Sequence, residues 1–194
     1  MQPHRAGSPH SDGYEGPLAE FAALRDEIQE RVKAQQQILT LQLTISGGVF
    51  GFAISQPGMT ALLLIVPFSS YLLCGRLVAQ HFGTVRVAQY IAEELDGRVP
   101  GGLGWEKWLR ERPRSPHVLG FALPHLLTFV AASLLALAWA AGYVFLRGDV
   151  AIAQRAGLVT IWLLGLATTA LSTTLVMQMA GMLSVRSWQQ TGLS

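Results

Sequence analysis

The stretch that decides the fold is Ala34–Gly75, AQQQILTLQLTISGGVFGFAISQPGMTALLLIVPFSSYLLCG, in which no Asp, Glu, Lys or Arg occurs. One membrane-spanning helix needs about 20 predominantly apolar residues, so this stretch is long enough for two. The break lies at Ser55-Gln56-Pro57-Gly58, because the interior of a helix does not tolerate a Pro-Gly pair. We therefore predict a hairpin of two spanning helices, Ile38–Ser55 and Met59–Ala79.

Two further stretches without formal charge follow, Val118–Leu146 and Ala156–Val185. Only 13% of the chain is charged and 51% is hydrophobic, whereas soluble domains carry about 25% charged residues. This deficit indicates that lipid replaces water around much of the chain. The sequence predicts an all-α integral membrane protein of four spanning helices.

Lys and Arg residues predict the orientation, because cytoplasmic loops carry an excess of them. The segment between the second and third helices is the richest in basic residues, whereas the two short hairpin loops hold none and two. We expect both termini and this middle segment to be cytoplasmic. The 12 Arg and 2 Lys, in a chain rich in Ala, Gly and Leu, favour a bacterial source, so the expected location is the bacterial inner (plasma) membrane.

The predicted organisation has six parts, defined by charge, apolar content and helix breakers. Residues 1–16 have no apolar core of a signal peptide and are expected to form a disordered tail. The parts that follow are a cytoplasmic helix continuous with the first span (17–37), the first hairpin (38–79), a cytoplasmic amphipathic or interfacial segment (80–116), the second hairpin (117–185) and a cytoplasmic tail (186–194).

The helix expected at 17–37 carries apolar residues at helical spacing. Two interpretations stay open for it: a juxtamembrane helix that lies against the bundle, and a stalk that joins copies of the chain. The residues that form its apolar stripe are Leu18, Phe21, Leu24, Ile28 and Val32.

The segment 80–116 begins with a second apolar stripe and is expected to leave its helix near Gly97. Beyond a Gly-rich loop, Trp105 and Trp108 alternate with Lys107, Arg110 and Arg112. Indole rings beside basic side chains favour the headgroup region of a membrane. We predict that Trp105, Trp108, Arg110 and Arg112 anchor this segment on the inner leaflet, an interpretation that the position between two spans favours over nucleic-acid binding.

Chemistry-bearing residues are scarce within the predicted spans. Within the three uncharged stretches, His125 is the one side chain that ordinarily titrates near neutral pH, and it is expected to hydrogen-bond a neighbouring helix or to act as a titrating switch. No carboxylate lies in a span, which argues against intramembrane hydrolases, proton carriers and Mg²⁺-dependent headgroup transferases. We expect a non-enzyme with no catalytic residue, no cofactor and no metal; an interfacial enzyme or carrier would have to use His81 or His117 with Glu106.

Small and hydroxyl side chains form faces within the first and fourth spans. They include a Gly-x-x-x-Gly pair, a spacing that lets another backbone approach closely. Two interpretations remain: close packing between helices, or the lining of a water-filled path in a homo-oligomer. The predicted face residues are Thr40, Thr44, Gly47, Gly48, Gly51 and Ser55 in the first span and Thr169 and Thr173 in the fourth.

The order of these parts resembles a group of small bacterial membrane proteins to which no activity is assigned. The resemblance rests on EFAALRDEI at Glu20–Ile28, the glutamine-rich entry into the first span and GLGWE at Gly102–Glu106. More loosely, the region from Pro17 to Gly97 is similar in topology to SLATT-type membrane effectors of bacterial conflict systems. That resemblance implies pore formation on a trigger, although those proteins lack the third and fourth helices.

The expected function is therefore that of a non-enzymatic, homo-oligomeric bacterial inner-membrane protein, as a pore-forming or membrane-perturbing effector. The alternative is a membrane anchor or scaffold whose cytoplasmic segment 80–116 docks a soluble partner. The expected partners are the lipid bilayer, further copies of the chain and, in the alternative, that soluble protein.

Overall fold

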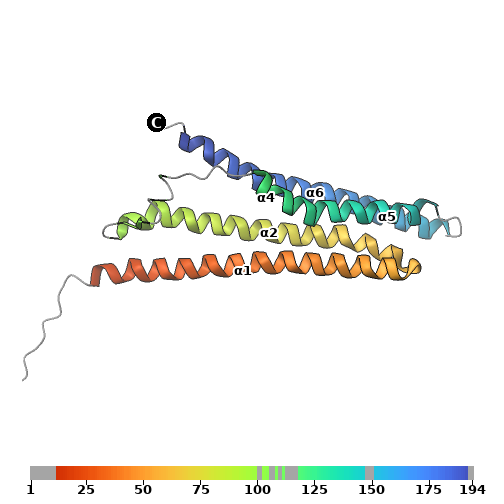
Figure 1. Cartoon of the computed structure of the whole chain (residues 1–194), viewed down its shortest axis with the longest axis horizontal. Coiled ribbons are helices and arrows are strands. Elements are labelled where there is room, and N and C mark those ends of the chain that lie inside the picture. Colours follow the sequence, from red (N-terminus) through yellow and green to blue (C-terminus); the bar gives the residue numbers. More distant parts are fainter. Residues whose placement is uncertain are drawn as a thin grey trace, which may run out of the picture. The chain divides into compact units, whose positions relative to one another are not determined.

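The structure is a computed structural model, which describes residues 12–99, 102–104, 108, 111, 118–146 and 151–191. In these residues the chain is all-α, as the sequence predicts. Four of the described helical segments are long and apolar enough to cross a membrane, by length and composition (Figure 1). These segments are Glu15–Ser55, Gly58–Arg98, Ala122–Leu146 and Ile152–Gly181.

Helix α1 is one helix from Asp12 to Ser55, which corrects the expected disordered tail at 12–16. Pro17 lies near the start of α1. Proline lacks a backbone N–H, so only one intrahelical hydrogen bond is lost at this position, and the helix can begin before the proline. At the other end, Gln56 takes an extended conformation with φ −135° and ψ 96°, as the residue before a proline does. The predicted break at Pro57 is confirmed.

The second segment begins with the 3₁₀ helix η1 (Pro57–Leu64) and continues as α2 (Ile65–Tyr90). A π-helical turn, η2 (Ile91–Leu95), and a 3₁₀ turn, η3 (Asp96–Arg98), end it. The segment therefore stays helical for about five turns beyond Ala79, the predicted end of the span. It ends next to the predicted Gly97, where the Asp96 carboxylate accepts the backbone N–H of Leu103 at 2.6 Å and Gly102 has a φ of 70°, a value that glycine adopts without strain.

The third segment consists of α4 (Val118–His125), the π-helical η4 (Leu126–Ala131) and α5 (Ala132–Leu146). The whole uncharged stretch, Val118–Leu146, is helical in it. Pro124 has no N–H to donate and precedes the π-helical turn, a common place for a helix irregularity. Within that turn the Thr128 hydroxyl donates to the Pro124 carbonyl at 2.8 Å.

Helix α6 (Ile152–Thr191) is longer at both ends than the predicted 156–185. Its first turn is closed by the Arg155 N–H, which donates to the Ala151 carbonyl at 2.9 Å. A criterion based on missing charge finds only the apolar part of a helix, because Arg and Gln are also good helix formers. The residues 186–191, expected as a tail, are therefore helical.

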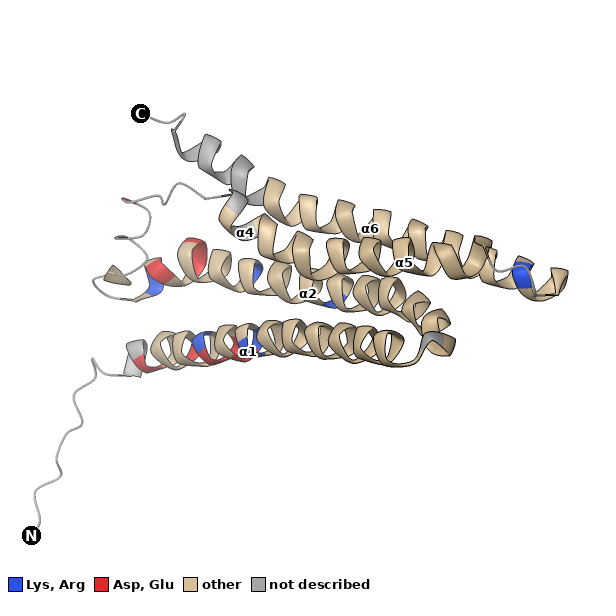
Figure 2. Cartoon of the chain, turned by 45° about the vertical axis from the view of Figure 1, so that its right-hand side comes forward, with Lys and Arg blue, Asp and Glu red and all other residues tan. Residues whose placement is uncertain are grey.

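The first two segments are about twice as long as a membrane is thick. Each contains 41 residues, which extend about 60 Å at 1.5 Å per residue, whereas the hydrocarbon core measures about 30 Å. Charged side chains lie on the N-terminal part of α1 and, in the second segment, from the middle of α2 through η2 and η3 (Figure 2). The C-terminal half of α1 and the first half of the second segment carry no carboxylate. These two halves are therefore the parts suited to lipid.

The chain divides into two compact units, and the first contains Met1–Lys33 and Phe82–Arg114. In this unit the N-terminal part of α1 has an intramolecular partner. The Tyr90 hydroxyl donates to the Glu20 carboxylate at 2.7 Å, and the Arg31 guanidinium lies against Gly83. The same guanidinium pairs with Glu27 at 2.6 Å, the i,i+4 pair expected on a helix surface.

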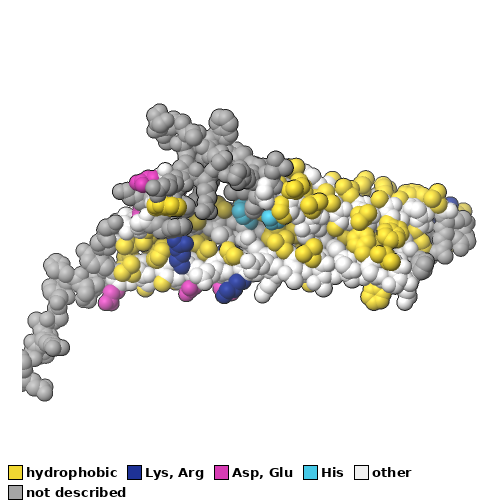
Figure 3. Space-filling view, viewed as in Figure 1, with side chains coloured by type: hydrophobic (Ala, Val, Ile, Leu, Met, Phe, Trp, Pro, Cys, Tyr) yellow, Lys and Arg dark blue, Asp and Glu magenta, His cyan; other side chains and the backbone are white. Residues whose placement is uncertain are grey.

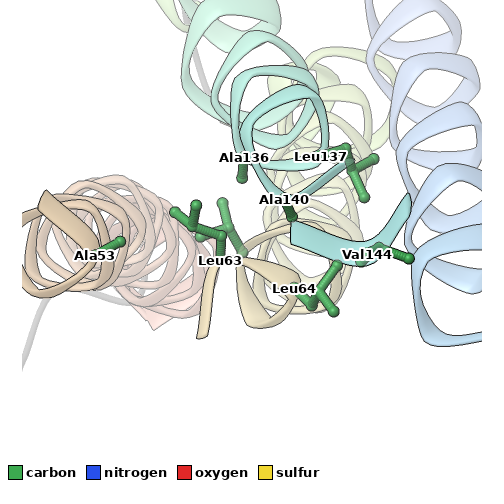
Figure 4. Close-up of a cluster of buried hydrophobic side chains, with 8 residues drawn as sticks. Ala53, Leu63, Leu64, Ala136, Leu137, Ala140 and Val144 are labelled. Carbon is green, nitrogen blue, oxygen red and sulfur yellow. The ribbon is translucent and has the colours of Figure 1, made fainter. Parts of the chain in front are cut away.

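The second unit contains Ala34–His81 and Ser115–Ser194, and its core lies between η1, α5 and the end of α1. Figure 4 shows Leu63 of η1 between Ala53 of α1 and Ala136 of α5, whereas Leu137 and Val144 of α5 point toward α6. Trp162 of α6 packs at the side of this core. Its indole N–H donates to the Leu137 carbonyl at 2.9 Å, and its ring contacts the Phe145 ring edge-on, with 5.4 Å between the ring centroids. The buried members are Ala53, Leu63, Leu64, Val66, Ala136, Leu137, Ala140 and Val144.

Large apolar side chains also cover the outside of this unit, as the space-filling view shows over α5 (Figure 3). Leu135 is 58% exposed and Leu163 of α6 is 53% exposed. Soluble monomers rarely expose contiguous apolar patches larger than a few hundred Å². A helix that is apolar on its inner and outer faces is instead typical of a membrane span.

Candidate functional site

The six predicted face residues of the first span all point outward in the second unit. We call them the outer face of α1: Thr40, Thr44, Gly47, Gly48, Gly51 and Ser55. A Cβ added at any of the three glycines would meet nothing within 4 Å. Among the described residues, none packs closely against these glycines.

The hydroxyls of the outer face are bonded to the backbone of their own helix. Thr40 donates to the Gln36 carbonyl at 3.0 Å, Thr44 to the Thr40 carbonyl at 2.9 Å and Ser55 to the Gly51 carbonyl at 2.8 Å. Such i−4 bonds satisfy the donors without a neighbouring helix. The hydroxyl oxygens still have lone pairs that can accept from an outside donor.

Larger side chains flank the outer face on both sides. At about 100° per residue, Leu41 and Phe52 fall on one side of it, and Leu43 and Ile54 fall on the other. All four are exposed, Phe52 by 61% and Ile54 by 63%. The outer face is thus a shallow strip of backbone and hydroxyls between two apolar ridges, a shape that fits another helix at close approach.

Helix α1 packs on the rest of the unit through the opposite face, about 180° away by the same rotation. Its centre is Gln42, which is fully buried. The Gln42 side-chain amide donates to the hydroxyls of Ser46, at 3.0 Å, and of Ser70 in α2, at 2.6 Å. These bonds join the two helices of the first hairpin and explain why this face is the one that is buried.

Gln42 is a residue that sequence reasoning missed, although a signal for it was present. It lies between Leu41 and Leu43 in an uncharged span, one turn before Ser46. An amide placed in hydrocarbon without a partner costs several kcal/mol, on the order of 2–7. A glutamine in such a place therefore marks the inward face of a span more reliably than glycines do.

The two predicted face residues of the fourth span lie inside the subunit instead. Thr169 is 3% exposed and donates to the Gly165 carbonyl at 2.8 Å, and Thr173 is half-buried and donates to the Thr169 carbonyl at 2.9 Å. Next to them the Cys74 thiol points at the Ser172 carbonyl at 3.9 Å. The structure does not bring these threonines together with the outer face of α1.

Of the four predicted interfacial anchors, Trp108 is described and is 39% exposed. Trp105, Arg110 and Arg112 lie outside the described residues. Their role at a membrane surface stays a prediction.

Two histidines come together in the second unit, His81 of α2 and His125 at the end of α4. They are within electrostatic reach of each other, and the described histidines lie next to one another in Figure 3. His117 lies outside the described residues. Among the described residues, no group of three or more His, Cys, Asp or Glu is placed to hold a metal ion.

The comparisons with known proteins give no relative from which a role could be transferred. No protein family matches this chain, and no curated protein or solved structure is significantly similar to it.

Proposed function

We propose that this chain is a non-enzymatic, homo-oligomeric protein of the bacterial inner membrane, in which copies pack through the outer face of α1 and together permeabilise the bilayer. Both termini and the segment 80–116 lie in the cytoplasm in this proposal. The single observation that carries it is the outer face itself, a strip of glycine and hydroxyl residues that no part of the described subunit covers.

Contact with lipid alone does not require a strip of glycine and hydroxyl residues on the surface of a helix. Acyl chains are as apolar as leucine, so helices associate in a membrane through close van der Waals packing and interhelical hydrogen bonds. At Gly47 and Gly51 the backbone is open to approach, and the ridges beside it can fit into the grooves of a second helix. A second copy of α1 supplies the matching strip by symmetry.

The polar groups of the outer face also suit a wet path. Thr40, Thr44 and Ser55 lie along one line of α1 and keep acceptor oxygens, and no charged residue lies between Ala34 and Gly75. A ring of copies lined by this strip would hold water without selecting strongly for charge. Its expected effect in a cell is loss of membrane potential.

The test is a leucine at Gly51. We expect Gly51→Leu to weaken self-association in mild detergent by about tenfold or more, equivalent to about 1.4 kcal/mol, because the side chain holds the two backbones apart. The monomer should keep its thermal stability, since the added atoms enter open space. Association is measured by native mass spectrometry, and membrane potential by a voltage-sensitive dye in expressing cells.

The matched control is Gly142→Leu in α5, which is also exposed and also has nothing within 4 Å. It should change neither association nor membrane potential. A wild-type protein that is monomeric in mild detergent and leaves cells polarised would overturn the proposal. That result would favour the anchor or scaffold whose segment 80–116 docks a soluble partner.

A further inference from the structure

A groove opens between α1 and α2 at the level where the charge-free stretch ends. Its volume is about 220 Å³, and all its residues belong to the second compact unit. We call it the Arg76 groove. It is lined by Ala34, Gln37, Ile38 and Leu41 of α1 and by Leu73, Arg76 and Gln80 of α2.

The groove changes from polar to apolar along the helix axis. Gln37 and Arg76 line the part nearer the charged halves of the helices, and Leu41 and Leu73 line the part nearer the hairpin turn. Leu41 lies about 6 Å along the axis from Gln37, and Leu73 lies about 4.5 Å from Arg76, at 1.5 Å per residue. This is the order of groups in a phospholipid that stands in a bilayer.

Arg76 gives the polar part a positive charge. It is the first charged residue after Lys33, and its side chain is exposed. Among the described residues, none of the ion pairs involves Arg76. A guanidinium binds phosphate oxygens with two parallel N–H donors.

We propose that the Arg76 groove binds an anionic phospholipid, with its phosphate on the Arg76 guanidinium and the Gln37 amide, and with one acyl chain over Ile38, Leu41 and Leu73. Ordinary small-molecule pockets measure about 300–1,000 Å³, so this groove holds only part of a lipid. The rest of the lipid stays in the bilayer, which the open side of the groove faces. Zwitterionic lipids are disfavoured because their ammonium group repels Arg76.

The inference rests on the membrane insertion contained in the proposed function, but not on the oligomer. The experiment uses the full chain in detergent micelles, with native mass spectrometry as the readout. Phosphatidylglycerol, phosphatidylcholine and inorganic phosphate are each added to the wild type, to Arg76→Gln and to Arg86→Gln. Arg86 is the matched control, since it is exposed on the same helix but does not line the groove.

We expect the wild type to retain phosphatidylglycerol about tenfold more strongly than phosphatidylcholine, since charge-assisted hydrogen bonds supply roughly that difference. Arg76→Gln should abolish the preference, and Arg86→Gln should keep it. A third variant, Leu73→Ser, should weaken retention of both lipids without changing their ratio.

Three results would overturn the lipid site. They are equal retention of the two lipids by the wild type, an unchanged preference in Arg76→Gln, and displacement of phosphatidylglycerol by inorganic phosphate at similar concentration. The last would identify a phosphate site instead. Repeating the series with Gly51→Leu separates this inference from the proposed function, because a monomeric variant should retain the lipid preference in full.

Discussion

Replacing Gly165 by leucine is expected to cost the second unit about 3 kcal/mol or more of folding free energy, at the upper end of overpacking effects. Gly165 lies on α6 beside Pro67 of α2 and Leu137 of α5. A Cβ alone would lie 3.0 Å from Cγ of Pro67 and 3.1 Å from Cδ2 of Leu137. Leucine adds three more carbons at this point, so the helices have to separate. Thermal unfolding in detergent measures the loss.

The control for this change lies two turns earlier in the same helix. Gly157 has open space around its Cβ position, so Gly157→Leu adds the same atoms without a clash. Leucine is the better helix former by roughly 0.5–1 kcal/mol, and we expect Gly157→Leu to be neutral or slightly stabilising. Equal destabilisation by both variants would show that α6 does not pack on α2 and α5 through Gly165.

Leu137→Ala is expected to destabilise the same core from the other side, by about 2–5 kcal/mol. The Leu137 side chain is 2% exposed and belongs to the buried cluster between α1, η1 and α5. Its removal leaves a cavity that backbone hydrogen bonds within the helices prevent from closing. The measurement is again the thermal midpoint in detergent.

Leu135→Ala is the matched comparison for Leu137→Ala. Leu135 lies two residues away on α5 and is 58% exposed, so lipid or detergent fills the space that its side chain leaves. We expect its loss to cost less than about 1 kcal/mol, since substitutions away from the core seldom exceed this. A larger effect from Leu135 than from Leu137 would mean that α5 is rotated, with its outer face packed against protein.

The four helices could be predicted because charge is costly in lipid and proline interrupts a helix. The uncharged stretch Val118–Leu146, for example, is helical throughout. The helix ends at Ser55 and near Gly97 were also predicted, whereas the start of α1 and both ends of α6 differ from the predicted bounds. A residue such as Arg155 continues a helix as readily as leucine does, so a change in polarity marks the edge of the apolar part and not the end of the helix.

The residues of the candidate site could be predicted from the sequence, but whether they face the interior or the outside of the subunit could not. Helical spacing places Thr40, Gly47 and Gly51 on one face of α1, yet spacing alone does not say whether that face points into the subunit. The buried Gln42 on the opposite face decides this, through its bond to Ser70. Thr169 and Thr173 were predicted to form a face of the fourth span, for helix packing or for lining a water-filled path, and the structure buries Thr169 and half-buries Thr173 within the subunit.

The two proposals for the second unit concern adjoining surfaces of α1 that share Leu41, and their tests can fail separately. The outer face of α1 would meet another copy, and the Arg76 groove on the α2 side of the same helix would hold a lipid. Both depend on one premise, which is that the uncharged halves of the helices pass through lipid.

That premise can be measured with single cysteines in intact bacterial cells. Cys74 is the one cysteine of the chain and is buried, so Cys74→Ala gives a background without thiols. A membrane-impermeant maleimide should label Gln154→Cys, at the start of α6, from outside the cells. It should label Gln29→Cys, on the N-terminal part of α1, only after the cells are permeabilised. Labelling of Gln29→Cys in intact cells, or recovery of the protein in the aqueous fraction without detergent, would contradict this account.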